Sequence, residues 1–158
     1  MFNFRRFLAL FRPELYTPFE LAERDIAQGR YEDALIRLQS LAASDGLAAV
    51  ERASIANKRG VALVNLERRV HAQQAFEEAL AHARAFAPAL VNLGNLELES
   101  GHVGAAVRWY ERAVLCDDQY APAHHNLSVA YKRLGRTSEA VRELRRAYKL
   151  EGRVVRKR

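Results

Sequence analysis

Two consecutive stretches of this chain have closely similar sequences, and they decide its fold. Residues 87–120 read APALVNLGNLELESGHVGAAVRWYERAVLCDDQY, and residues 121–152 read APAHHNLSVAYKRLGRTSEAVRELRRAYKLEG. Aligned at an offset of 34 residues, the two stretches are identical at 11 of 32 positions. Self-similarity at a fixed period of this size is typical of repeat architectures, in which each unit packs against the next.

Two further copies precede these stretches, and the same small side chains recur in all four. The copies cover residues 53–86 and, more divergently, 15–48, with four residues inserted between them. Eleven of the twelve residues at unit positions 8, 20 and 27 are Ala, Gly or Ser: they are Ala22, Gly60, Gly94, Ser128, Ala34, Ala72, Ala106, Ala140, Leu41, Ala79, Ala113 and Ala147. Position 24 is aromatic or leucine. Small side chains at such spacings let two helices of one unit cross closely.

This combination of period and small residues resembles the tetratricopeptide repeat. The resemblance implies an all-α protein, a right-handed α-solenoid of helix-turn-helix units with a short amphipathic helix in front. Departures from the family pattern are Leu90 and His124 at position 4, and Arg59 at position 7. We expect one repeat domain, 14–152, containing four units at about 15–48, 53–86, 87–120 and 121–152.

Residues at the ends of the expected helices agree with this division. Thr17 and Glu20 form a capping-box pattern with Pro18 at the first helical position. Glycines stand where the first helix of three units ends and a left-handed residue is favoured: Gly29, Gly101 and Gly135. Four inserted residues correspond to about one helical turn, so we expect a longer first helix in the second unit, beginning near Leu47.

Composition excludes several classes of protein. A single cysteine, Cys116, excludes an internal disulfide framework and a multi-cysteine zinc site, and we expect it to fill space as a small apolar residue. No stretch approaches the roughly 18 apolar residues of a membrane-spanning helix. Phe7 to Phe11 is too short an apolar run for a secretory signal, so we expect a cytoplasmic protein.

The sequence contains no constellation typical of catalysis. It has no nucleophile elbow, phosphate-binding glycine loop, HExxH or paired CxxC motif. His124 and His125 are adjacent, point about 100° apart on a helix, and cannot chelate one metal together. We interpret them as one semi-buried histidine and one that faces the groove. The sequence therefore predicts a non-catalytic protein with no metal and no cofactor.

Asparagines gather on one face of the predicted first helices. Unit positions 2, 6, 9 and 13, with 5 and 12 beside them, point away from the buried stripe, and we call this surface the groove face. Five of the six asparagines fall on it, although asparagine costs a helix interior roughly half a kcal/mol relative to alanine. In the resembled family this face is concave. The predicted peptide-binding residues are Asn57, Lys58, Asn65, Asn92, Asn95, Leu98, His125, Asn126, Lys132 and Arg133.

Two interpretations of these asparagines remain open. A side-chain amide both donates and accepts, so it can bind the main chain of a peptide of any sequence; alternatively, the amides are solvated or join neighbouring repeats. In the resembled family, chaperone-binding members carry a carboxylate clamp made of residues at five positions. The five clamp positions hold Asn57, Val61, Asn92, Pro122 and Asn126, and only Asn92 matches. We therefore do not expect a chaperone C-terminal tail as the ligand.

Both ends of the chain are basic, whereas the middle is mildly acidic. Residues 1–13 carry three arginines and no acid, and residues 132–158 carry eleven basic and three acidic residues. In the first segment Phe4, Phe7, Leu8 and Phe11 share one helical face. This helix either caps the first repeat or docks on a partner or an anionic membrane. Residues 153–158 are expected to form a frayed basic tail. No aromatic residues that could stack on bases accompany this tail, so we do not expect nucleic-acid binding.

The sequence predicts a protein–protein interaction adaptor or scaffold that binds a peptide segment in the groove of a superhelix. The alternative is a scaffold at the membrane surface that self-associates through its ends and is recruited by its basic and amphipathic termini. In that case the cytoplasmic protein would be peripherally attached to anionic lipid.

Overall fold

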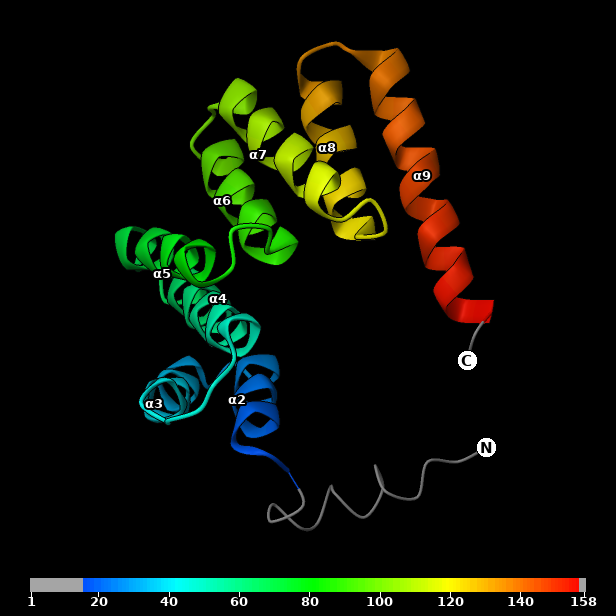
Figure 1. The fold of residues 1–158 in the computed structure, drawn as a ribbon. Helices are drawn as coiled ribbons and strands as arrows, with labels where there is room; N and C mark the ends of the chain where they lie inside the picture. Colours follow the sequence, from blue (N-terminus) through cyan, green and yellow to red (C-terminus); the bar gives the residue numbers. More distant parts are fainter. Residues whose placement is uncertain (1–15, 157–158) are drawn as a thin grey trace.

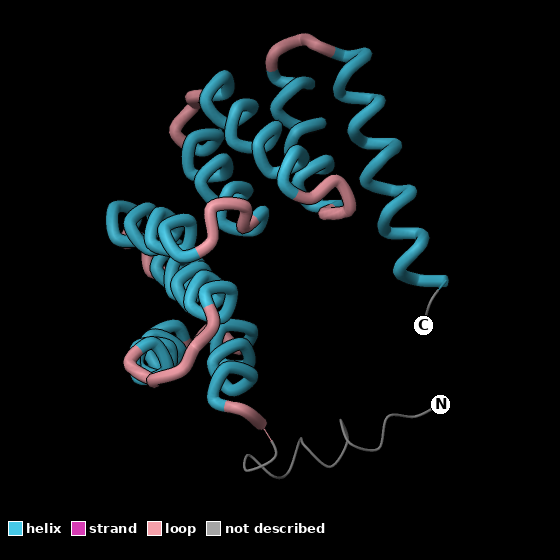
Figure 2. Tube along the Cα trace, viewed as in Figure 1, coloured by secondary structure: helices cyan, strands magenta, loops and turns pink. Residues whose placement is uncertain are grey.

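Paired helices account for almost all of the described chain. The structure is a computed structural model that describes residues 16–156, with side chains through residue 152. Its helices are α2 (Pro18–Ala27), α3 (Tyr31–Ala42), α4 (Ala49–Asn65), α5 (Arg69–His82), α6 (Ala87–Glu99), α7 (Val103–Cys116), α8 (Ala121–Arg133) and α9 (Thr137–Arg156). No strand occurs in this range, and Figure 2 shows only helices and short loops. The predicted N-terminal helix, with Phe4, Phe7, Leu8 and Phe11, lies outside the described residues.

The helix pairs follow one another along an arc (Figure 1). Each predicted unit forms one antiparallel pair: α2/α3, α4/α5, α6/α7 and α8/α9. In this view α3 and α5 lie on the outer side of the arc, and α2 and α4 lie nearer its inside. Contacts join each helix to its neighbours in the chain, and join α2, α4, α6 and α8 in succession. The predicted all-α solenoid of repeated helix pairs is confirmed.

Most of the predicted helix ends are found where the sequence places them. The Glu20 amide donates to Thr17 Oγ1 at 3.2 Å, and the Thr17 amide donates to Glu20 Oε2 at 2.8 Å, which completes the capping box. These bonds, the backbone bond first, lower the pKa of Glu20. Gly29, Gly101 and Gly135 have φ of 75°, 81° and 73°. The second unit differs, because Glu67 holds the same position with φ 58°.

Two helices depart in length from the others. Helix α4 has 17 residues against 13 in α6 and in α8, so the insertion lengthens it as expected, although it begins at Ala49 rather than near Leu47. Helix α9 has 20 residues and continues to Arg156. The expectation of a frayed tail from residue 153 is therefore wrong for its first four residues, whose backbone is helical.

The small residues are buried where the two helices of a pair cross. Eleven of the twelve small-residue positions are buried, and only Leu41 is partly exposed. A Cβ on Gly60 would lie 2.3 Å from Cε1 of Phe76, and one on Gly94 would lie 2.4 Å from Cε1 of Tyr110. The units that have alanine or serine at this position have leucine opposite it. Glycine at position 8 therefore makes room for an aromatic ring at position 24.

The buried core divides into three clusters along the arc. The first contains Ala22, Leu38 and Ile55, and so joins the first pair to α4. Helix α6 belongs to both of the others: Leu93 packs with residues of α4 and α5, and Leu90 packs with residues of α7 and α8. Among residues 16–156, no helix is long and apolar enough to span a bilayer.

Candidate functional site

Two of the predicted asparagines join the second pair to the third. Asn92 on α6 donates through Nδ2 to Oδ1 of Asn57 on α4 at 2.9 Å. Asn57 is only 6% exposed, so it lies beneath the surface rather than on it. The bond satisfies a buried carbonyl oxygen that would otherwise lack a partner. For Asn57 and Asn92, the structure shows the role of joining neighbouring repeats.

A second amide contact joins the third pair to the fourth through a different position. Asn126 on α8 donates through Nδ2 to Oδ1 of Asn95 on α6 at 2.8 Å. The hydroxyl of Tyr110 on α7 donates to the same oxygen, also at 2.8 Å. Burial, and to a lesser extent the nearby charge of Glu99, raises the pKa of Tyr110, so the hydroxyl stays protonated as a donor. Because Asn95 receives both bonds on its oxygen, its two N–H groups can still bind a ligand.

The other predicted residues differ in how much they are occupied by the protein itself. Asn65 donates to the carbonyl oxygen of Val61 at 2.9 Å, within its own helix. Lys58 pairs with Glu23 at 2.6 Å, and Arg133 donates to the carbonyl oxygen of Leu98 at 3.3 Å. His125 and Lys132 are exposed on α8. Contacts between α4, α6 and α8 thus bring the predicted residues together on adjoining helices.

Two hollows open between α4 and α6 on this surface. One, of about 100 Å³, is lined in part by the apolar residues Val61, Val64 and Leu96 and by Asn92 and Asn95. The other, of about 290 Å³, shares Val64 and Leu96 with it. Both hollows are smaller than the roughly 300–1,000 Å³ of typical small-molecule pockets.

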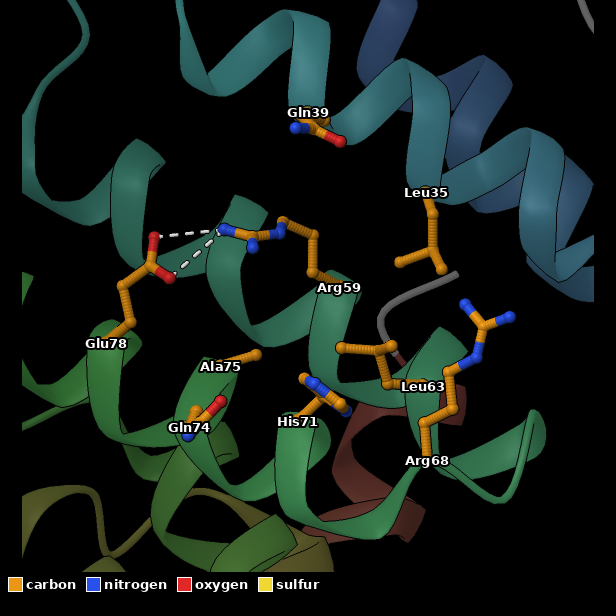
Figure 3. A pocket seen from close by; sticks show the side chains of 9 residues that line it. All are labelled: Leu35, Gln39, Arg59, Leu63, Arg68, His71, Gln74, Ala75 and Glu78. Carbon is orange, nitrogen blue, oxygen red and sulfur yellow. Dashed lines mark hydrogen bonds and ion pairs between the residues drawn. The ribbon is translucent and has the colours of Figure 1, made fainter.

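A larger hollow lies elsewhere, between α3, α4 and α5 (Figure 3). It has a volume of about 440 Å³ and contains none of the predicted site residues. Its arginines are already engaged: Arg59 Nη1 lies 3.1 Å from both carboxylate oxygens of Glu78, and Arg68 lies 2.7 Å from Glu32. The departure from the family pattern at Arg59 is thus explained by an ion pair within the second unit.

A buried carboxylate in the first unit is a feature that the sequence analysis missed. Asp25 on α2 is 2% exposed and accepts hydrogen bonds from Arg37 Nε at 2.7 Å and from Arg30 Nε at 3.0 Å. Burial by itself raises the pKa of Asp25, but the bonds from the two arginines outweigh it, and the pKa lies below its ordinary value. The cluster joins α2 to α3. Spacing alone offered no signal for it, because Arg37 is twelve residues away in the sequence.

His124 is buried, and both of its ring nitrogens contact residues outside its own helix. Its Nδ1 lies 2.8 Å from Glu143 Oε2 on α9, and its Nε2 lies 3.1 Å from the carbonyl oxygen of Asp118. His125, by contrast, is exposed. Cys116 is exposed too, so the expectation that it fills space in the core is wrong. Among the described side chains, no group of three His, Cys, Asp or Glu residues is placed to hold a metal.

The chain is similar to one protein-family model and to several solved structures. Residues 121–153 match the family model of the tetratricopeptide repeat. Among curated protein sequences, none matches the chain. The match covers the last of the four units, which is also the one whose sequence repeats the preceding unit most closely.

Solved structures match over much more of the chain. A crystal structure of MamA has a TM-score of 0.68 and 21% identity, and the match covers 96% of this chain and 87% of that one. A second MamA structure has a TM-score of 0.65 and 22% identity, covering 88% and 74%. The second tetratricopeptide-repeat domain of Spaghetti (RPAP3), bound to the HSP90 peptide SRMEEVD, has a TM-score of 0.59 and 21% identity, covering 63% and 93%. At these identities the likeness shows a shared fold.

Proposed function

Because this chain is a tetratricopeptide-repeat protein, we propose that it is a non-catalytic adaptor that binds a segment of another protein along its groove face. Solenoids of this kind present extended surfaces that follow the curvature of their repeats. The groove face is carried by α4, α6 and α8, which lie in succession. A bound segment could therefore contact three repeats at once.

One observation carries this proposal: amide groups from successive helices meet in pairs and still have bonding capacity. Asn95 keeps two N–H groups, and Asn92 and Asn126 each keep a carbonyl oxygen and one N–H. These spare groups include both donors and acceptors, which the main chain of a peptide also offers. Each bond to such a main chain would contribute on the order of 1 kcal/mol.

The charge of the groove face suggests what kind of segment it prefers. Lys132 and Arg133 lie at the end of α8 and are exposed, whereas Lys58 is paired with Glu23. We expect the ligand to place negative charge near α8. The RPAP3 domain binds a peptide that contains two glutamates and an aspartate. Since this chain has only one of the five clamp residues, we expect a ligand contacted along its length rather than one held by its terminal carboxylate.

The experiment is a selection from a displayed library of linear peptides, followed by titration calorimetry. The groove variant combines His125→Glu with Lys132→Glu, because these residues are exposed and make no bond between repeats among the described side chains. The control combines Arg84→Glu with Arg108→Glu, two exposed arginines away from the groove face, and it lowers the net charge at least as much as the groove variant does. Peptides selected by the wild-type chain should bind the groove variant at least tenfold more weakly and the control unchanged.

Binding that is equally weakened in the two variants would reflect net charge alone and would contradict the proposal. Binding unchanged in both would place the site off the groove face. Circular dichroism of each variant verifies that the helices are intact.

A further inference from the structure

The repeat allows α9 to be compared with α7, residue by residue. An offset of 34 places Val141, Leu144 and Tyr148 of α9 where α7 has Val107, Tyr110 and Val114. These three residues of α9 are spaced by three and four, so they share one side of the helix, and we call them the end face.

In α7 the corresponding side is covered by the next helix. Val107 is 5% exposed and belongs to one buried cluster with Leu127 and Tyr131 of α8, against which Val114 also packs. The hydroxyl of Tyr131 donates to Glu111 Oε1 at 2.7 Å, which fixes the register of the two helices. Burial, with this bond, raises the pKa of Tyr131 to about 12, so it remains a donor.

In α9 two of the three residues of the end face are exposed, whereas Leu144 is partly buried. Val141 is 41% exposed and Tyr148 is 61% exposed, and both are large apolar residues. Basic residues border them: Arg142, Arg145 and Lys149 are exposed. Arg145 of α9 stands at the position that Glu111 has in α7. A helix that packed on α9 as α8 packs on α7 would therefore meet a cation where Tyr131 meets a hydrogen-bond acceptor.

We infer that the end face binds a helix from a protein partner, and that this helix has an apolar stripe and a carboxylate opposite Arg145. The existing interface between α7 and α8 gives the geometry, and the exchange of glutamate for arginine gives the charge. This surface is separate from the groove face, so the inference does not depend on the proposed function.

Charge also argues against two other occupants. The segment 1–13 would have an apolar face as a helix, but it carries three arginines and no acid and would be repelled. A second copy of this chain would offer α2 in place of α8. There Asp25 stands at the unit position of Tyr131, and its carboxylate is buried and already held by Arg30 and Arg37.

The test uses two stapled helical peptides with the α8 sequence, residues 121–133, one carrying Tyr131→Glu and the other Tyr131→Lys. Fluorescence anisotropy measures their binding to the whole chain. We expect the glutamate peptide to bind about tenfold more tightly than the lysine peptide. Arg145→Glu in the protein should reverse this order. Val141→Asp with Tyr148→Asp should weaken binding of the glutamate peptide at least tenfold.

The control is Ile36→Asp with Val70→Asp. It alters two other exposed apolar residues, Ile36 on α3 and Val70 on α5, which are 69% and 68% exposed. It should leave binding unchanged. Equal binding of the two peptides, or an order that Arg145→Glu does not reverse, overturns the inference. So does a third outcome, in which the wild-type chain binds vesicles of phosphatidylcholine and phosphatidylserine through Val141 and Tyr148 but binds neither peptide. That result would make the end face a membrane surface. Arg145 is exposed, so its substitution tests the inference even if the aspartate variant fails to fold.

Discussion

Glu67 occupies a backbone conformation that three glycines occupy in the other units. Its φ of 58° lies in the left-handed region, where a side chain costs energy that glycine does not. We predict that Glu67→Gly raises the free energy of unfolding by about 0.5–1 kcal/mol, since glycine's greater freedom in the unfolded chain offsets part of the gain. Urea denaturation measures the change. Glu67→Ala is the control, because alanine keeps the left-handed cost, and equal stability of the two variants would contradict the explanation.

Asn92 illustrates how a residue expected in a binding surface also stabilises the array. Asn92→Ala leaves the buried Oδ1 of Asn57 without its donor, so we predict a loss of about 1–3 kcal/mol in thermal or urea unfolding. Asn65→Ala is the matched control, because Asn65 is exposed and bonded within its own helix. It should cost nothing and gain up to about half a kcal/mol from helix propensity. Similar losses in both variants would argue against the contact between repeats.

At the scale of the helix pair, positions 8 and 24 are matched in size. The second unit pairs Gly60 with Phe76, whereas the first pairs Ala22 with Leu38. We predict that Gly60→Ala destabilises the chain by about 1–3 kcal/mol, since the new methyl group overlaps the Phe76 ring. Adding Phe76→Leu should recover about 1 kcal/mol or more relative to the sum of the single changes. A double-mutant cycle from urea denaturation measures this coupling, and strictly additive losses would refute the matching.

The helices also show which structural features can be predicted from the sequence. The repeat, the small residues and the helix ends follow from spacing along one helix, which a sequence displays directly. Contacts between repeats do not, because they depend on how neighbouring helices are offset. Asn92 contacts position 5 of the preceding unit and Asn126 contacts position 9, although both stand at position 6. Asp25 was missed for the same reason, and Glu67 was missed because the glycine that marks its conformation is absent.

At the scale of the whole molecule, each helix pair of the described residues makes its main contacts with the pairs next to it, so stability is close to a sum of local terms. The pKa of Asp25 is lowered below its ordinary value of 3.8. Its stabilising effect is therefore fully present above that pH and is lost as the pH falls through the lowered value. We predict that pepsin, added as the pH falls below 3.8, first cleaves within α2 and α3 and leaves α6 to α8 intact.

Asp25→Asn provides the control for this acid sensitivity. It should make the first pair less stable at neutral pH and remove the additional loss on acidification, because the amide does not titrate in this range. Cleavage spread evenly over the chain in the wild-type protein would contradict a local effect of Asp25.

Contacts in chain order also determine how the molecule would respond to a pulling force. A load applied at the two ends passes through every interface in series, so the total extension is the sum of small displacements at each one. The second and third pairs meet through fewer residues than the other neighbouring pairs do, so we expect the junction between α4/α5 and α6/α7 to be the most compliant. A segment bound along all three helices would bridge this junction and carry part of the load. Occupying the groove face would then stiffen the protein as well as bind a partner.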